Sequence, residues 1–215
     1  MRKLLVTMFV SLDGVMQAPG GADEDRDDGF EHGGWSVPFF EPQMIERMGA
    51  LTDRAAALLL GRRTYEVFAA NWPLSEPDDP IGAKLNSMPK YVASRTLTSV
   101  AWQNSTLLKG DVVDAVRELK EGDGGEIQVH GSGGLIQTLI EHDLVDEFHV
   151  LVFPVLIGSG KRLFGDGTIP ARLKLIDTTT SGTGVVTSRY ARDGKLEYGA
   201  MGPETGNWEP ATGDR

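Results

Sequence analysis

The sequence alternates short apolar runs with longer segments whose apolar residues recur at helical spacing, and this alternation restricts the fold more than any other feature. The apolar runs are rich in Val, Leu or Ile and are bounded by Gly, Pro or Ser, which is typical of buried strands. They cover residues 3–10, 57–60, 90–94, 126–130 and 146–157. Helical spacing covers residues 41–55, 111–122 and 134–144. Strands that alternate with helices predict an α/β fold with a mixed, mostly parallel sheet and helices on both faces.

The last third of the chain has a different pattern. Residues 172–181, 184–193 and 195–201 read as strands joined by tight turns that contain Gly. We expect these strands to be antiparallel and to lie at one edge of the sheet. We also expect a single domain over residues 1–201, followed by a flexible tail over 202–215, which holds few apolar residues.

Composition limits the possible functions. The chain has no cysteine, which excludes disulfides and thiolate metal sites, and its four histidines show no metal-ligand spacing. A formal net charge of −10 argues against nucleic-acid binding. The first apolar run is too short to cross a membrane and lacks a cleavage-site pattern, so we expect a cytoplasmic protein with no membrane partner. An anionic ligand would have to be held by a few local groups against the overall negative charge.

Residues 129–135, VHGSGGL, lie between a predicted strand and a predicted helix. Glycines let a backbone approach a ligand closely, and the start of a helix attracts anions through its free amide groups. Two interpretations remain open for this segment, a tight turn without a ligand and a phosphate-binding turn. In the second, the binding residues are Gly131, Ser132, Gly133, Gly134 and Leu135.

Two further strand-to-helix junctions carry positive charge. Gly61 ends one predicted strand, and Arg62, Arg63 and Thr64 open the helix that follows. The dipeptide Ser94-Arg95 follows another predicted strand. Single arginines of this kind are commonly solvated surface residues. Three such junctions at the carboxyl ends of strands nevertheless favour a ligand site, because open α/β sheets bind ligands at that edge.

Several segments together resemble a known family. They are SLDG at 11–14, GRRTYE at 61–66, SRTL at 94–97 and the long block at 129–164, which is the most specific of them. With them, residues 1–200 resemble the dihydrofolate-reductase-like superfamily. The most similar branch is the reductase domain of the bifunctional riboflavin-biosynthesis deaminase-reductase, whose activity is 5-amino-6-(5-phosphoribosylamino)uracil reduction, together with its stand-alone relatives.

The resemblance implies a three-layer fold, a homodimer and NADPH as cofactor. It implies that Gly61, Arg62, Arg63 and Thr64 contact the pyrophosphate or the adenosine ribose. Ser94 and Arg95 would hold the 2′-phosphate, and residues 131–135 would surround the pyrophosphate and the nicotinamide half. The substrate implied is a small heterocycle, pterin-like or pyrimidine-like, reduced by hydride transfer.

The catalytic residues are less well defined by the sequence. Asp13 is the best-placed carboxylate and Trp35 could form an apolar wall against a substrate ring, although a turn-forming Asp and a core Trp are the alternatives. In dihydrofolate reductases a carboxylate anchors the pterin at the position that Phe40 occupies here. Glu41 is adjacent, but one step along a helix rotates a side chain by about 100°. A folate substrate is therefore not expected.

A long acidic loop covers residues 18–34, and loops of this length in compact domains are usually functional lids or disordered. Lys161 and Arg162 are candidates for holding a substrate phosphate. The acidic residues at 22–28 would repel a phosphorylated substrate if this loop folded over the site. His130 is a candidate contact for the cofactor, with an ordinary strand-end histidine as the alternative, and His32 is a candidate proton donor. A non-catalytic nucleotide-binding protein with the same fold is the alternative function.

Overall fold

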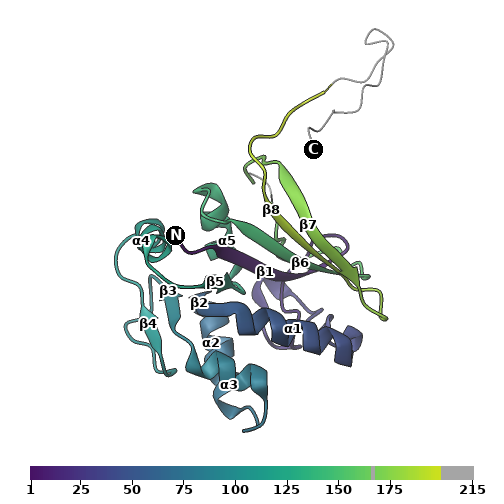
Figure 1. Ribbon diagram of the computed structural model, residues 1–215. Helices are drawn as coiled ribbons and strands as arrows, with labels where there is room; N and C mark the ends of the chain where they lie inside the picture. Colours follow the sequence, from purple (N-terminus) through teal and green to yellow (C-terminus); the bar gives the residue numbers. More distant parts are fainter. Residues whose placement is uncertain (166–167, 200–215) are drawn as a thin grey trace, which may run out of the picture.

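The computed structural model describes residues 1–165 and 168–199, and its central feature is an eight-stranded sheet of order β4-β3-β2-β5-β1-β6-β8-β7 (Figure 1). The strands are β1 (Leu4–Ser11), β2 (Ala55–Gly61), β3 (Lys90–Ala93), β4 (Ser105–Leu107), β5 (Glu126–Val129), β6 (Glu147–Phe153), β7 (Leu173–Thr180) and β8 (Val186–Arg192). Neighbouring strands from β4 to β6 are parallel, whereas β8 pairs antiparallel with both β6 and β7. The predicted mixed sheet with an antiparallel C-terminal edge is confirmed.

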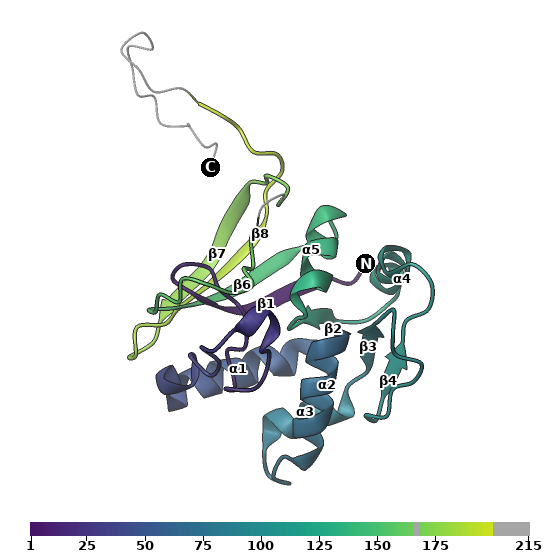
Figure 2. The same cartoon turned by 180° about the vertical axis from the view of Figure 1, so that it is seen from behind.

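The middle strands are mostly apolar, as expected where both faces of the sheet are covered. β1 and β2 are almost entirely buried, as expected of parallel strands between two helical layers. The helices are α1 (Pro42–Arg54), α2 (Arg62–Asn71), α3 (Pro80–Ser87), α4 (Val112–Glu121) and α5 (Gly133–Glu141). In Figures 1 and 2, α4 and α5 lie above the sheet and α1, α2 and α3 lie below it. The predicted three-layer arrangement is therefore present.

Each layer has its own apolar core. Leu135 and Ile136 of α5 pack with Val116 of α4 against one face of β1, β2, β5 and β6. On the other face, Tyr65 of α2 and Leu85 of α3 pack against β2 and β3, and α1 packs against β6 through a separate aromatic cluster. None of the helices in the described residues is long and apolar enough to cross a membrane.

Three parts of the sequence prediction need correction. The strand predicted over 146–157 ends at Phe153, because Pro154 has no amide hydrogen to continue the ladder. The described part of the strand predicted over 195–201, residues 195–199, is not a strand. The sequence analysis also missed α3 and β4, which are short elements of eight and three residues. The predicted tail at 202–215 lies outside the described residues.

Candidate functional site

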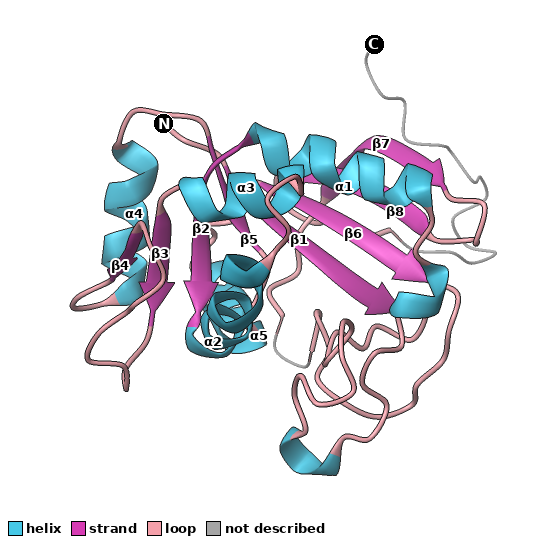
Figure 3. Ribbon diagram, turned by 90° about the horizontal axis from the view of Figure 1, so that it is seen from below, coloured by secondary structure: helices cyan, strands magenta, loops and turns pink. Residues whose placement is uncertain are grey.

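Three strand-to-helix junctions meet at one edge of the sheet. β3, β2 and β5 are adjacent and parallel, so their carboxyl ends lie at the same edge, where α2 and α5 begin (Figure 3). A cavity of about 1080 Å³ opens at this edge. Its lining includes every residue that the sequence analysis assigned to a cofactor, namely Gly61, Arg62, Arg63, Thr64, Ser94, Arg95, Gly131, Ser132, Gly133, Gly134 and Leu135. The structure therefore brings the three predicted junctions into one site.

The starts of α2 and α5 are held against each other. The amide of Gly61 donates to the carbonyl of Gly131 at 3.2 Å, and the hydroxyl of Ser132 accepts from the amide of Thr64 at 3.2 Å. Gly131 has φ +131°, and a Cβ there would lie 2.5 Å from the Thr64 hydroxyl. A Cβ at Gly61 would lie 2.6 Å from the Ser132 hydroxyl. Only glycine allows the two junctions to approach this closely.

The way these two helices begin favours an anion. α3 and α4 start with Asp79 and Asp111, whose carboxylates accept the first free amides of the helix. α2 and α5 start at Gly61 and Ser132, and neither residue caps its own helix with a side chain. The Ser132 hydroxyl accepts the Thr64 amide of α2, and the other first amides of the two helices and the positive ends of their dipoles face one cavity. Such an arrangement is suited to a pyrophosphate.

The third junction adds a polar turn and a cation. The hydroxyl of Ser94 accepts the amides of Thr96 and Leu97 at 3.1 and 3.0 Å, which shapes the turn after β3. Arg95 is exposed and pairs with no carboxylate among the described residues, whereas Arg62 lies 3.3 Å from Glu66. Arg95 is thus available to a ligand phosphate at this end of the cavity.

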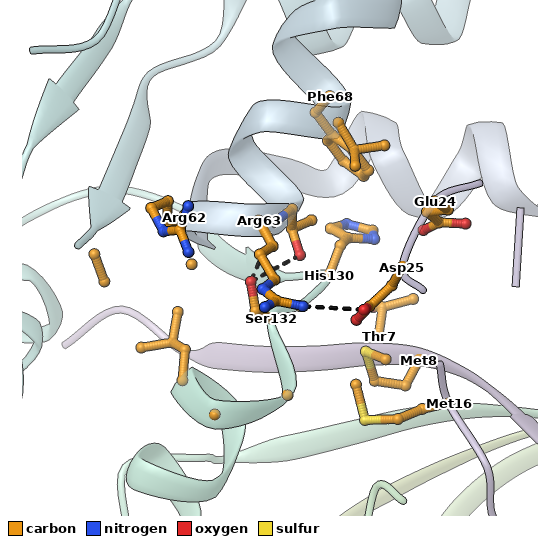
Figure 4. A pocket seen from close by; sticks show the side chains of 18 of the residues that line it. Thr7, Met8, Met16, Glu24, Asp25, Arg62, Arg63, Phe68, His130 and Ser132 are labelled. Carbon is orange, nitrogen blue, oxygen red and sulfur yellow. Dashed lines mark hydrogen bonds and ion pairs between the residues drawn. The ribbon is translucent and has the colours of Figure 1, made fainter. Parts of the chain in front are cut away.

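The acidic loop at 18–34 closes the opposite end. Asp25 and Asp27 line the cavity and bind Arg63 on α2 and Lys161 on the segment after β6. Glu24 also lines the cavity, and its carboxylate accepts the amides of Gly20 and Gly21 at 2.7 and 3.1 Å. Burial raises the pKa of Glu24 above its usual range. Figure 4 shows Glu24 and Asp25 on one side of the cavity and Arg62 on the other.

Neutral side chains form the wall between these ends. His130 is partly buried, and the cost of burying a charge lowers its pKa to about 4, so its ring is neutral at pH 7. Its Nε2 lies 3.2 Å from the Gln128 side-chain oxygen. Met8, Met16 and Phe68 supply apolar surface (Figure 4). Thr7 lines the same cavity, and its buried hydroxyl has no partner among the described residues.

The sequence analysis did not single out Thr7, Glu24 or Asp25. A polar residue inside the first apolar run was a possible signal for Thr7, because such a residue is expected to find a partner when buried. The acids of the loop could not be assigned individually, since the partners of Asp25 are 38 and 136 positions away in the sequence. Their role depends on how the loop folds.

The two predicted catalytic residues lie outside the cavity lining. The Asp13 carboxylate accepts the amides of Ile157 and Gly158 at 3.1 and 2.8 Å and the Ser11 hydroxyl at 2.6 Å. The Trp35 indole donates to the Gln17 carbonyl at 2.8 Å and packs edge-on against Phe153. The geometry thus gives Asp13 a place in a turn and Trp35 a place in the core.

The other residues that the sequence analysis considered also differ in whether they line the cavity. Lys161 lines the cavity, whereas Arg162 contacts the backbone and carboxylate of Asp13. His32 is exposed beside Phe30. Phe40 lines the cavity, whereas the Glu41 carboxylate is engaged elsewhere and accepts the amide of Gly182 at 2.9 Å.

Comparisons with known proteins identify the family of this chain. Residues 2–187 match the model of the RibD C-terminal domain. The chain belongs to the family of RibD C-terminal domains. It is 29% identical over 199 residues to the uncharacterized protein YyaP of Bacillus subtilis, covering 90% of this chain and 96% of YyaP. It is 26% identical to the uncharacterized protein YwjB of the same organism, with 86% and 95% covered.

Two solved structures share the fold. The “Putative riboflavin biosynthesis protein” from Shewanella sp. PV-4 matches with a TM-score of 0.64 at 24% identity, covering 89% of this chain and 99% of that one. A pyrimidine reductase-like protein from Corynebacterium diphtheriae matches with a TM-score of 0.57 at 16% identity, with 89% and 92% covered. The RibD-like fold implied by the resemblance is confirmed.

Proposed function

We propose that this protein is an NADPH-dependent reductase that transfers a hydride to a small heterocyclic substrate. Membership of the RibD C-terminal family and the fold shared with a pyrimidine reductase-like protein support a reductase-type function. The observation that carries the proposal is the convergence in one cavity of two helix starts with free amides and of Arg95, which pairs with no carboxylate among the described residues. These groups suit the two anionic parts of NADPH, its pyrophosphate and its 2′-phosphate.

Each part of the cavity has a role in this proposal. The starts of α2 and α5 would hold the pyrophosphate, while Ser94 and Arg95 would hold the 2′-phosphate. When bound, NADPH supplies the hydride. The apolar side chains Met8, Met16 and Phe68 exclude water, and Thr7 and His130 offer hydrogen bonds that orient a neutral ring.

Titration of the purified protein with NADPH and NADH tests the cofactor. We expect NADPH to bind more tightly, and we expect Arg95→Ala to weaken NADPH binding about tenfold or more, because a hydrogen bond to a charged group contributes about 1.5–3 kcal/mol. Binding of NADH should change little. Arg117→Ala on the exposed face of α4 is the matched control and should change neither affinity.

Three results would contradict the proposal or limit it. Equal weakening of both nucleotides by Arg95→Ala would remove the assignment of the 2′-phosphate site. A wild-type protein that binds neither nucleotide would refute the reductase assignment. Binding of NADPH without its oxidation across panels of pterins, pyrimidines and quinones would instead favour the non-catalytic nucleotide-binding function.

A further inference from the structure

The loop end of the cavity contains two cations that are already paired. Asp25 binds Arg63 at 3.0 Å and Lys161 at 2.5 Å, and Asp27 binds Lys161 at 2.9 Å and also contacts Arg63. Figure 4 shows the Arg63 guanidinium extended toward Asp25. Both cations are the kind of residue that would bind a phosphate ester, and both are held by carboxylates of the chain itself.

These carboxylates compete with a phosphate ester for Arg63 and Lys161 more strongly than carboxylates in ordinary surface ion pairs would. The Asp25 side chain is only 17% exposed, so water and salt screen it less than a surface carboxylate. Hydrogen bonds from Arg63 and then Lys161 lower the pKa of Asp27, and the Asp27 carboxylate raises the pKa of Arg63. Asp27 and Arg63 therefore stay charged at neutral pH. Glu24 adds a third carboxyl group, so acids outnumber bases at this end.

The remaining polar groups of this part of the cavity are neutral. Thr7 is 6% exposed, and its hydroxyl has no hydrogen-bond partner among the described residues. Leaving a buried hydroxyl unpaired costs free energy, and a ligand that supplies a partner removes that cost. His130 beside it carries no charge at neutral pH. Both groups suit an uncharged, hydrogen-bonding ligand.

We propose that the substrate of this site is an unphosphorylated, uncharged small molecule, and that Asp25 and Asp27 determine this specificity by occupying Lys161 and Arg63. The proposal rests on the proposed reductase function, because it concerns the substrate of that reaction. A phosphate ester would have to displace two tethered carboxylates and approach a third. A neutral ring meets only the apolar wall, Thr7 and His130.

Inorganic phosphate is the probe, and the amide NMR signal of Lys161 reports its binding at this end of the cavity. We expect wild-type protein to show no shift of that signal at millimolar phosphate. The Asp25→Asn/Asp27→Asn variant frees both cations and should bind phosphate at least about tenfold more tightly at this place. Lys161→Met added to this double variant, read on the amide signal of residue 161, should abolish the gain in phosphate affinity. Arg95→Ala added to the double variant lies at the far end of the cavity and should leave that gain unchanged.

Wild-type protein that binds phosphate at Lys161 as tightly as the double variant would overturn the proposal, as would a double variant with no gain. If the double variant does not fold, Asp27→Asn alone keeps the pairs that Asp25 makes with Arg63 and Lys161 and should still bind phosphate at Lys161 more tightly than wild type. No gain in this folded single variant would also overturn the proposal. A separate titration with NADPH tests the reductase function, so failure of one does not imply failure of the other.

Discussion

Asp13 illustrates how the surroundings of a residue decide its role. Its carboxylate accepts a hydroxyl and two amides, which joins the turn after β1 to residues 157 and 158 after β6. The hydrogen bond from Ser11, followed by that from Gly158, lowers the pKa of Asp13 to about 2. Hydrogen bonds of this kind stabilise the charged form of a carboxylate. Asp13 is therefore a poor proton donor at neutral pH.

The pH dependence of stability tests this role. The folded pKa of about 2 lies below the ordinary value of 3.8, so the stabilisation is present above pH 3.8 and is lost as the pH falls toward 2. We expect Asp13→Asn to lower the Tm at pH 7 and to differ little from wild type at pH 2. Asp23→Asn, which removes an exposed carboxylate paired only with Arg26, is the control. An unchanged Tm combined with lost NADPH oxidation would instead support a catalytic Asp13.

At the same scale, sequence reasoning identified the junction residues because their signals are local. A glycine or arginine directly after a strand is visible in a few consecutive positions, and all of the predicted junction residues line the cavity. The pairing of Asp25 with Lys161 was not visible, because it joins residues 136 positions apart. Asp13 was selected for its type and position, and two of the three groups that hold its carboxylate come from a distant segment.

At the scale of elements, long periodic segments were predicted well and short ones were not. α3 begins at Pro80 and is only eight residues long, and β4 has three residues, of which two are polar. Such segments carry too little periodicity to indicate their state. Tertiary contacts stabilise them instead. Lys90 of β3 is fully buried and donates to the carbonyls of Leu85 and Asn86 at the end of α3 and to that of Met88.

We expect Lys90→Met to destabilise the protein by about 2–3 kcal/mol, because three carbonyls around the end of α3 lose their donor in a buried place. Urea unfolding measures the change. Lys84 lies on α3, and its side chain makes no comparable bonds among the described residues, so Lys84→Met is the matched control. Burial lowers the pKa of Lys90 to about 8, so wild-type stability should rise between pH 8 and 10.5 as the unfolded chain retains the proton. A Lys90→Met variant as stable as wild type would show that these contacts contribute little.

At the scale of the whole molecule, the antiparallel edge of the sheet is the least covered part. β7 is exposed along most of its length, and Figure 1 shows β7 and β8 projecting away from the helices. Leu175 and Ile176 on β7 are 49% and 43% exposed. An edge strand with exposed apolar side chains can pair with another chain. β6, the apolar strand next to this edge, is buried between β1 and β8.

The predicted homodimer is therefore expected to form through β7, and its mass can be measured by light scattering after size exclusion. Charged residues on an edge strand block pairing with a second chain, so Leu175→Lys/Ile176→Lys should weaken the dimer by at least about tenfold while the domain stays folded. Leu74→Lys replaces a leucine that is 81% exposed near α3 and should leave the dimer intact. A monomeric wild type at tens of micromolar would contradict the dimer, and a dimer insensitive to the β7 substitutions would place the interface on another surface.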